Sequence, residues 1–369
     1  MDFTFSEEQD AVRDLATQVF EGHATPERVK EVERSEERVD RELWRALADA
    51  GLLAIAVPEE HGGSGLGLAE LCLLLEQQGR RVAPVPLWPT LVLGAPALAE
   101  FGSPEQQQSW LPGVSTGDLV LTAALAESGA NDPLRPQVTA TRDGDGWRLE
   151  GDKPSVPAGH VADRVLVPAS IGDGELGVFL VDPSGSGVER TVAATTDRSK
   201  VAHLSFSGAP GEPLGADGRR VTAWMLDRAL VGLCAMQVGV AEGALRMAAD
   251  YTSERQQFGR PLSTFQGVAL KAADAYIDTE AMRVTLWQAA WRLTAGLDAT
   301  REVMVAKWWA SEGGQRVVHI TQHLHGGMGA DVDYPVHRYF LWGKQIEDTL
   351  GGASAQLARL GRALAEASA

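Results

Sequence analysis

The spacing of apolar residues changes twice along this chain of 369 residues. Up to about residue 118 apolar positions recur at helical spacing, and Ser6-Glu7-Glu8-Gln9 has the pattern of a capping box that starts the first helix. Between about 119 and 215, short alternating or β-branched runs are separated by Gly, Asp and Pro, as expected of strands. These runs are 147–150, 164–167, 178–181 and 203–206.

From Thr222 onwards the helical period returns in long segments, which are interrupted at Gly259, Gly296 and Gly326. Long amphipathic segments with such breaks predict a helix bundle. The chain is therefore predicted to have an α+β fold in three parts: an N-terminal α-helical domain (1–118), a middle β domain of barrel or sandwich type (119–221) and a C-terminal helix bundle (222–369).

Composition narrows the class of protein. With 44% hydrophobic and 22% charged residues, the chain resembles an ordinary globular protein. A net charge of −17 argues against nucleic acid or an anionic membrane as partner. The two cysteines, Cys72 and Cys234, form no disulfide framework and no metal-binding pattern, so we expect no metal site. With no signal peptide and no apolar run of about 20 residues, we expect a cytoplasmic protein.

The break at Gly259 lies within the run Arg255-Gln256-Gln257-Phe258-Gly259-Arg260-Pro261-Leu262, which Phe265-Gln266 follow. Taken alone, this run predicts a surface turn between two helices, with solvated arginines. Arg-x-x-Phe-Gly followed by Phe-Gln nevertheless resembles the flavin signature of the acyl-CoA dehydrogenase family. The resemblance implies that Arg255 meets the pyrophosphate of FAD, that Phe258 and Gln266 line the dinucleotide, and that this FAD belongs mainly to a neighbouring subunit.

A second segment resembles the family's Gln-x-x-Gly-Gly-x-Gly run, in which glycines let the backbone approach the FAD pyrophosphate. Here it contains Gln322, His323, Gly326, Gly327 and Gly329. His323 stands where the family usually has Gln, with Gln322 one residue earlier. The order of helical, β and helical parts also matches the family's fold, so the resemblance covers the whole chain.

The resemblance fails at the catalytic base, which in the family is a Glu that removes the α-proton of the thioester. Leu350 occupies that position, and leucine cannot accept a proton. Some members place the base on the helix before the flavin signature, where this chain has Ala229, with Asp227 two residues away. We read Glu347 and Asp348 as solvated, so no catalytic residue is assigned.

The flavin platform of the middle domain also departs from the family. The family has Lys-x-Trp-Ile-Thr-Asn-Gly, in which Trp packs on the flavin and Thr supports the ring. Here residues 153–159 place Ser155 at the Trp position and Pro157 at the Thr position. Proline also lacks the N–H donor. The loop at 126–132 differs from the family's substrate-side loop as well.

Elements that would serve this chain's own flavin are therefore lost, whereas those that reach a neighbour's FAD are kept. This pattern resembles the degenerate subunit of heterotetrameric steroid side-chain acyl-CoA dehydrogenases of actinobacteria. It implies FAD as cofactor, a homologous catalytic subunit as partner, an acyl-CoA substrate and an electron-transfer flavoprotein as acceptor. The alternatives are a non-redox scaffold that binds CoA thioesters, a self-sufficient homotetramer with a base such as Asp227, and a dehydratase on the same fold.

Overall fold

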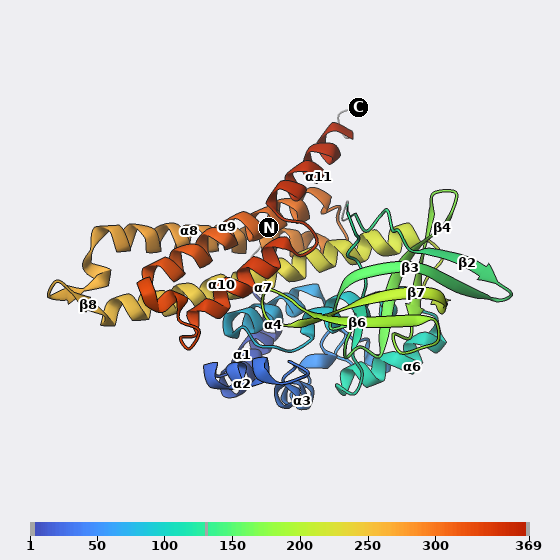
Figure 1. The fold of residues 1–369 in the computed structure, drawn as a ribbon, viewed down its shortest axis with the longest axis horizontal. Helices are drawn as coiled ribbons and strands as arrows, with labels where there is room; N and C mark the ends of the chain where they lie inside the picture. The colour runs from blue at the N-terminus through green and yellow to red at the C-terminus, as the bar shows by residue number, and fades with distance from the viewer. Residues whose placement is uncertain (1–3, 130–131, 367–369) are drawn as a thin grey trace. The chain divides into compact units, whose positions relative to one another are not determined.

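The computed structural model describes residues 4–129 and 132–366, and it contains the predicted helical, β-rich and helical parts in that order (Figure 1). The predicted fold class is confirmed. Contacts divide the chain into two compact units. One comprises Met1–Lys30, Cys72–Ala83 and Leu230–Ala369, and the other Glu31–Leu71 and Pro84–Ala229.

The first helices begin where the sequence places capping residues. The Gln9 N–H donates to Ser6 Oγ at 3.2 Å, and the Ser6 N–H donates to Gln9 Oε1 at 3.1 Å, which is the predicted capping box. Ser103 and Gln106 repeat this arrangement at the start of a later helix. The elements of this part are α1 (Glu7–His23), α2 (Pro26–Arg34), α3 (Arg41–Asp49), η1 (Leu52–Ala54), η2 (Glu59–His61), α4 (Leu68–Arg81), η3 (Trp88–Gly94), α5 (Ala95–Phe101) and α6 (Pro104–Ser115).

The β part closes on itself. Its strands are β1 (Leu121–Ala123), β2 (Thr139–Asp143), β3 (Gly146–Pro157), β4 (Arg164–Gly172), β5 (Glu175–Val181), β6 (Val188–Ala194) and β7 (Lys200–Pro213). The pairings β4–β2–β3–β7–β5–β4 form a ring, with β1 beside β4 and β6 beside β7. The four predicted runs lie in β3, β4, β5 and β7. β2 and β6 are largely exposed, and β2 is also mostly polar, so the spacing of apolar residues does not reveal them.

Long helices form the C-terminal part, and the predicted breaks are confirmed. The elements are α7 (Gly218–Glu254), β8 (Gln256–Gln257), β9 (Arg260–Pro261), η4 (Leu262–Thr264), α8 (Gln266–Thr294), α9 (Thr300–Leu324), η5 (Gly326–Ala330), α10 (Val336–Asp348) and α11 (Ala353–Glu366). Gly259, Gly296 and Gly326 all have positive φ, which glycine adopts without strain. α8 and α9 lie side by side (Figure 1).

Helix α7 is long and apolar enough, by length and composition alone, to cross a membrane. Most of its apolar stretch is buried inside the protein, as in the core helix of a globular domain, so the stretch is weak evidence for a membrane span. Both cysteines are buried free thiols, Cys72 on α4 and Cys234 on α7.

α4 and α7 cross at glycines. A Cβ added to Gly79 would lie less than 3.0 Å from Met236 O, and one added to Gly239 would lie less than 3.0 Å from Glu76 O. A Cβ on Gly243 would meet Arg80 O at 2.5 Å. The two helix backbones therefore touch, with no room for a side chain between them.

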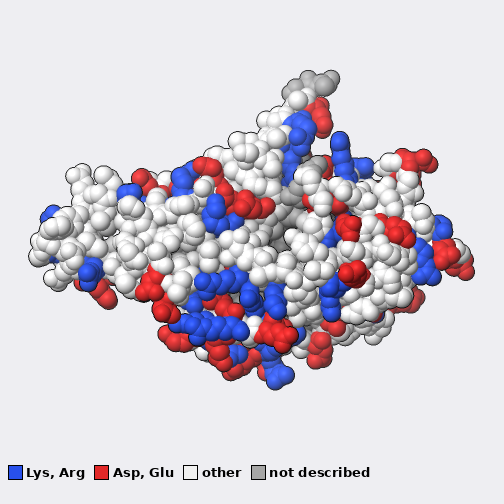
Figure 2. Space-filling view, viewed as in Figure 1, with Lys and Arg blue, Asp and Glu red and all other residues white. Residues whose placement is uncertain are grey.

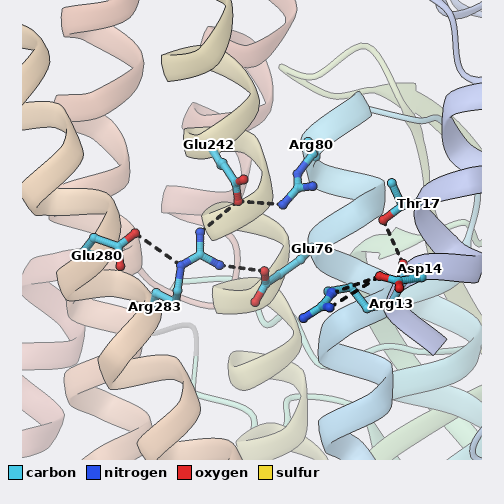
Figure 3. Close-up of polar contacts among 8 residues, drawn as sticks. All are labelled: Arg13, Asp14, Thr17, Glu76, Arg80, Glu242, Glu280 and Arg283. Atoms are coloured by element: carbon cyan, nitrogen blue, oxygen red, sulfur yellow. Dashed lines mark hydrogen bonds and ion pairs between the residues drawn. The ribbon is translucent and has the colours of Figure 1, made fainter. Parts of the chain in front are cut away.

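A charged cluster lies beside this crossing and joins three helices (Figure 3). Glu76 on α4 is buried, and its Oε2 accepts from Arg283 Nη1 of α8 at 2.9 Å. Arg283 also donates to Glu242 Oε2 of α7 at 2.9 Å, and Arg80 contacts the same oxygen at 2.8 Å. The most exposed member, Glu280, lies 3.4 Å from Arg283 Nε. Burial raises the pKa of Glu76 to about 7, against the opposing effect of Arg283.

Candidate functional site

The segment after α7 folds as a two-residue β-hairpin and not as a simple turn between helices. β8 and β9 pair antiparallel, with Gln256 opposite Pro261 and Gln257 opposite Arg260. Both turn residues, Phe258 and Gly259, have positive φ (53° and 79°). This is the dihedral pattern of a type I′ turn, whose twist matches that of paired strands. Glycine adopts a positive φ without strain, so Gly259 suits the turn. Phe258 is bulky, and a positive φ is unfavourable for such a residue.

The side chains of the hairpin that are predicted to bind FAD are exposed to solvent. Phe258 is 91% exposed, and its ring meets Phe265 edge-on with centroids 6.2 Å apart. Arg255 and Arg260 are exposed, and neither has an acidic partner among the described residues. Gln266 is exposed at the first position of α8. An exposed aromatic ring beside unpaired guanidiniums is typical of a site that binds a nucleotide, and less typical of a surface that contacts only solvent.

The glycine segment places its predicted residues in different roles. Gln322 Nε2 donates to Gly329 O at 2.9 Å, and a Cβ on Gly329 would collide with the Gln322 carbonyl, so this pair holds the segment closed. Gly326 and Gly327 are exposed, with no atom within 4 Å of an added Cβ. His323 is exposed as well. The open backbone at Gly326 and Gly327 is therefore the part of the segment that an anionic group could approach.

His325 organises this segment, although the glycine pattern gives it no role. It is buried, its Nδ1 lies 2.7 Å from Thr321 O, and its ring stacks on Tyr251 at 4.6 Å. Tyr334 contacts the same imidazole at 5.2 Å. Burial lowers the pKa of His325, which favours the neutral ring. The imidazole thus joins the end of α9 to α7. The sequence does offer a signal for this role, because His325 is an aromatic residue at helical spacing directly before the glycine run.

The position of the family's catalytic base is occupied by a buried apolar residue. Leu350 is buried with φ of 59°, and its carbonyl accepts from Arg359 Nη1 at 3.2 Å and Gln356 Nε2 at 3.3 Å. Asp348 is exposed, as the sequence reading had it. Glu347 is not freely solvated, because its side chain is only 16% exposed and pairs with Lys344 Nζ at 2.6 Å. That ion pair between residues one helical turn apart was not anticipated.

The alternative base position is also apolar. Ala229 is fully buried, and its carbonyl accepts from Trp88 Nε1 at 3.0 Å. Asp227 is half-buried next to Arg228, which stacks on the Trp224 ring at 3.6 Å. No carboxylate therefore occupies the Ala229 position itself.

The departures in the middle domain lie on a distorted stretch of β3. Its pairing with β7 shifts between Lys153 and Val156, and Ser155 and Ala158 both have positive φ. The Ser155 N–H donates to His203 Nδ1 at 3.3 Å. This stretch offers neither the indole nor the threonine hydroxyl on which the family's flavin platform depends.

A buried ion pair joins the two altered segments of the middle domain. Lys153 Nζ and Glu127 Oε1 form it, and both side chains are almost fully buried. Glu127 Oε2 also accepts from the Gln137 N–H at 3.2 Å. Ala130 and Asn131, in the same loop as Glu127, lie outside the described residues. The pair fixes the loop to β3, and its two buried charges balance each other.

A flavin dinucleotide therefore fits one region of this chain and not another. The hairpin provides unpaired cations and an exposed ring for the phosphates and the nucleotide. The stretch around Ser155 lacks the groups that would support an isoalloxazine ring. Within the described residues, no group of three or more His, Cys, Asp or Glu is arranged to hold a metal ion.

Two models of one protein family match most of the chain. The N-terminal domain model of acyl-CoA dehydrogenases matches residues 6–118, and the C-terminal domain model matches 216–365. Acyl-CoA dehydrogenase FadE27 of Mycobacterium tuberculosis is 43% identical over 375 residues, which cover 99% of each chain.

Two solved structures are similar over nearly the whole chain. A variant of the Tcur3481-Tcur3483 steroid ACAD is 53% identical with a TM-score of 0.94, covering 98% of this chain and 99% of that one. The ChsE4-ChsE5 complex from Mycobacterium tuberculosis is 43% identical with a TM-score of 0.93, covering 99% of both chains. The chain therefore belongs to the acyl-CoA dehydrogenase family of FAD flavoproteins, oxidoreductases that act on the CH–CH group of acyl-CoA.

Proposed function

We propose that this chain is the non-catalytic subunit of a heteromeric FAD-dependent acyl-CoA dehydrogenase. It contacts the ADP and pyrophosphate part of an FAD whose flavin ring lies in a homologous catalytic subunit. The partner supplies the carboxylate base. The observation that carries the proposal is the hairpin, where Arg255 lacks an acidic partner among the described residues and Phe258 is exposed in a strained conformation. Strain at an exposed aromatic residue suits a site that another molecule completes.

An apolar stripe on α8 supports the inference that a partner subunit binds this chain. Leu270, Ile277, Val284 and Trp291 follow one another at intervals of seven residues, and all four are exposed. A seven-residue repeat places them in one line along the helix, the arrangement by which helices pack against each other. Figure 2 shows the part of the surface that carries α8 as largely uncharged. An exposed apolar stripe of this length is a suitable surface for packing against a helix of another subunit.

The residues that this chain retains and lacks divide the reaction between it and the partner subunit. When bound, FAD would supply the acceptor for a hydride from the β-carbon of the acyl-CoA. In this chain Leu350 and Ala229 cannot accept a proton, so the α-proton is removed in the partner. This chain binds and orients the dinucleotide through Arg255, Phe258 and Gln266, and through the open backbone at Gly326 and Gly327.

The substrate class follows from similarity alone. One similar structure is described as a steroid ACAD and another as a complex of two named subunits. We extend both properties to this chain, with a steroid side-chain CoA thioester as substrate and an electron-transfer flavoprotein as acceptor. A cytoplasmic location belongs to the same proposal.

Co-expression with a homologous chain that carries the base tests the proposal. The purified complex should contain one FAD per pair of unlike chains, and this chain alone should purify without flavin. A yellow homotetramer of this chain, with one FAD per subunit, would refute the proposal.

The apolar stripe gives a second test of the same proposal. Ile277→Lys combined with Val284→Lys should prevent assembly, whereas Val192→Lys, which changes an exposed apolar residue of β6, should not. Assembly of the double variant at wild-type yield would remove the stripe from the interface.

A further inference from the structure

Two arginines share one face of the β8–β9 hairpin. Gln257 lies directly opposite Arg260, so their side chains project from the same face. The Leu262 N–H donates to Arg255 O at 2.9 Å, which extends the ladder by one residue pair. Arg255 is two residues before Gln257, and side chains two apart on a strand lie on one face. Arg255 and Arg260 are therefore diagonal neighbours, and such positions are about 7–8 Å apart.

This pair of cations is unbalanced in a strongly acidic protein. The chain has 50 Asp and Glu against 33 Lys and Arg, and three arginines of α7 and α8 are paired with carboxylates, namely Arg246, Arg283 and Arg292. Arg246, for example, contacts Asp250 at 3.5 Å, and Arg283 contacts three carboxylates. Arg255 and Arg260 have no such partner among the described residues. Two adjacent guanidiniums with no counter-charge form a site for a dianion.

The side chain of Arg260 is held in place by an aromatic ring. Its guanidinium carbon lies 4.1 Å from the centre of the Phe265 ring, a cation–π contact. Phe265 is half-buried at the start of α8, so the ring is a firm support. A stacked guanidinium keeps its N–H groups free at the edge, where they can donate to phosphate oxygens.

We propose that Arg260 is a second phosphate-binding residue, which with Arg255 forms a two-arginine clamp on the diphosphate of FAD. The inference rests on the proposed function, in which this hairpin meets an FAD of the neighbouring subunit. Each guanidinium takes one phosphate group, so both charges of the diphosphate are matched. Phe265 acts as a positioning residue, because its ring holds the guanidinium of Arg260.

The test uses the assembled complex and measures flavin release on dilution, by fluorescence, at low and high ionic strength. Arg260→Ala should weaken FAD binding about tenfold or more, as the loss of a charge-assisted contact to phosphate does. Arg260→Lys should restore part of the affinity, because the charge returns without the planar fork. Phe265→Leu should weaken binding less than Arg260→Ala. The loss caused by Arg260→Ala should shrink at high ionic strength.

Arg246→Ala is the matched control, because it removes one exposed arginine of α7 with the same change in net charge. If Arg255→Ala releases flavin and Arg260→Ala behaves like Arg246→Ala, the clamp is refuted while the proposed function stands. If Arg255→Ala also leaves flavin bound, the proposed function itself fails. If Arg260→Ala instead weakens binding of the CoA thioester with flavin retention unchanged, the anion is the diphosphate of CoA, and the assignment to FAD is wrong.

Discussion

Replacing Glu76 by glutamine should stabilise the protein near neutral pH, although it removes a carboxylate that contacts an arginine. Burial raises the pKa of Glu76 from 4.5 to about 7, so ionising this group in the folded protein is unfavourable even beside Arg283. A tenfold change in a protonation equilibrium corresponds to about 1.4 kcal/mol, so the cost of ionisation is about 3 kcal/mol.

The sign of the pH dependence follows from proton binding. Between pH 4.5 and about 7 the folded state keeps the Glu76 proton and the unfolded state releases it. Stability should therefore fall as pH rises through this window, and this contribution levels off above it. Glutamine does not titrate. The variant should match wild type near pH 4.5 and exceed its free energy of unfolding by about 3 kcal/mol above pH 7.

An opposite outcome has a physical basis too, because breaking a buried ion pair typically costs about 3–5 kcal/mol when it strands a charge. Arg283 is not stranded here, since Glu242 and Glu280 remain 2.9 Å and 3.4 Å from it. The glutamine carbonyl can also accept from Arg283 in place of the carboxylate.

The assay is urea unfolding of the assembled protein, followed by tryptophan fluorescence at about pH 5 and about pH 8, with Glu280→Gln as the exposed control. A deficit of Glu76→Gln relative to wild type that is equal at both pH values would show that the buried ion pair is net stabilising. Such a result would refute a raised pKa for Glu76 in the folded protein.

Three further predictions concern the base positions and a buried lysine. Leu350→Glu should lower the free energy of unfolding by about 2 kcal/mol or more, because it buries an unpaired carboxylate; the flavin content of the complex should stay unchanged, and a second FAD would contradict this. Asp227→Asn should leave the rate of anaerobic flavin reduction by acyl-CoA nearly intact, whereas abolished reduction with flavin still bound would assign the base to this chain. Lys307→Met should cost about 2 kcal/mol, since the buried ammonium donates to Ile346 O at 2.8 Å and Glu347 O at 3.0 Å; an unchanged urea midpoint would show that these carbonyls find other donors.

Local signals predicted much of the architecture. The capping box at Ser6, the glycine breaks and the four alternating runs each depend on residues close in sequence, and the structure contains all of them. The turn after α7 was predicted as a break but not as a hairpin. Its type I′ geometry requires positive φ at Phe258, a conformation that a bulky residue rarely adopts and that sequence propensity therefore argues against.

Tertiary interactions between charged residues could not be predicted in the same way. Glu76 and Arg283 are 207 residues apart, and each looks like a surface position of an amphipathic helix. Only the contact between α4, α7 and α8 buries them together. The pairing of Lys153 with Glu127 could not be predicted for the same reason. In the sequence, the segments that carry these two charges are notable only for the family residues that they lack. The proposed roles of Arg255, Phe258 and Gln266 remain predictions.

The glycine crossing of α4 and α7 has a consequence for directed evolution of this protein. Alanine for glycine inside a helix is a routine stabilising change, worth up to about 1 kcal/mol through helix propensity. At Gly22 of α1 and Gly361 of α11 an added methyl group meets nothing within 4 Å, so the usual gain applies. At Gly79 and Gly239 the same methyl group would enter the backbone of the facing helix. A consensus or library approach that treats helical glycines alike would combine gains with losses, and those losses would be mistaken for functional effects.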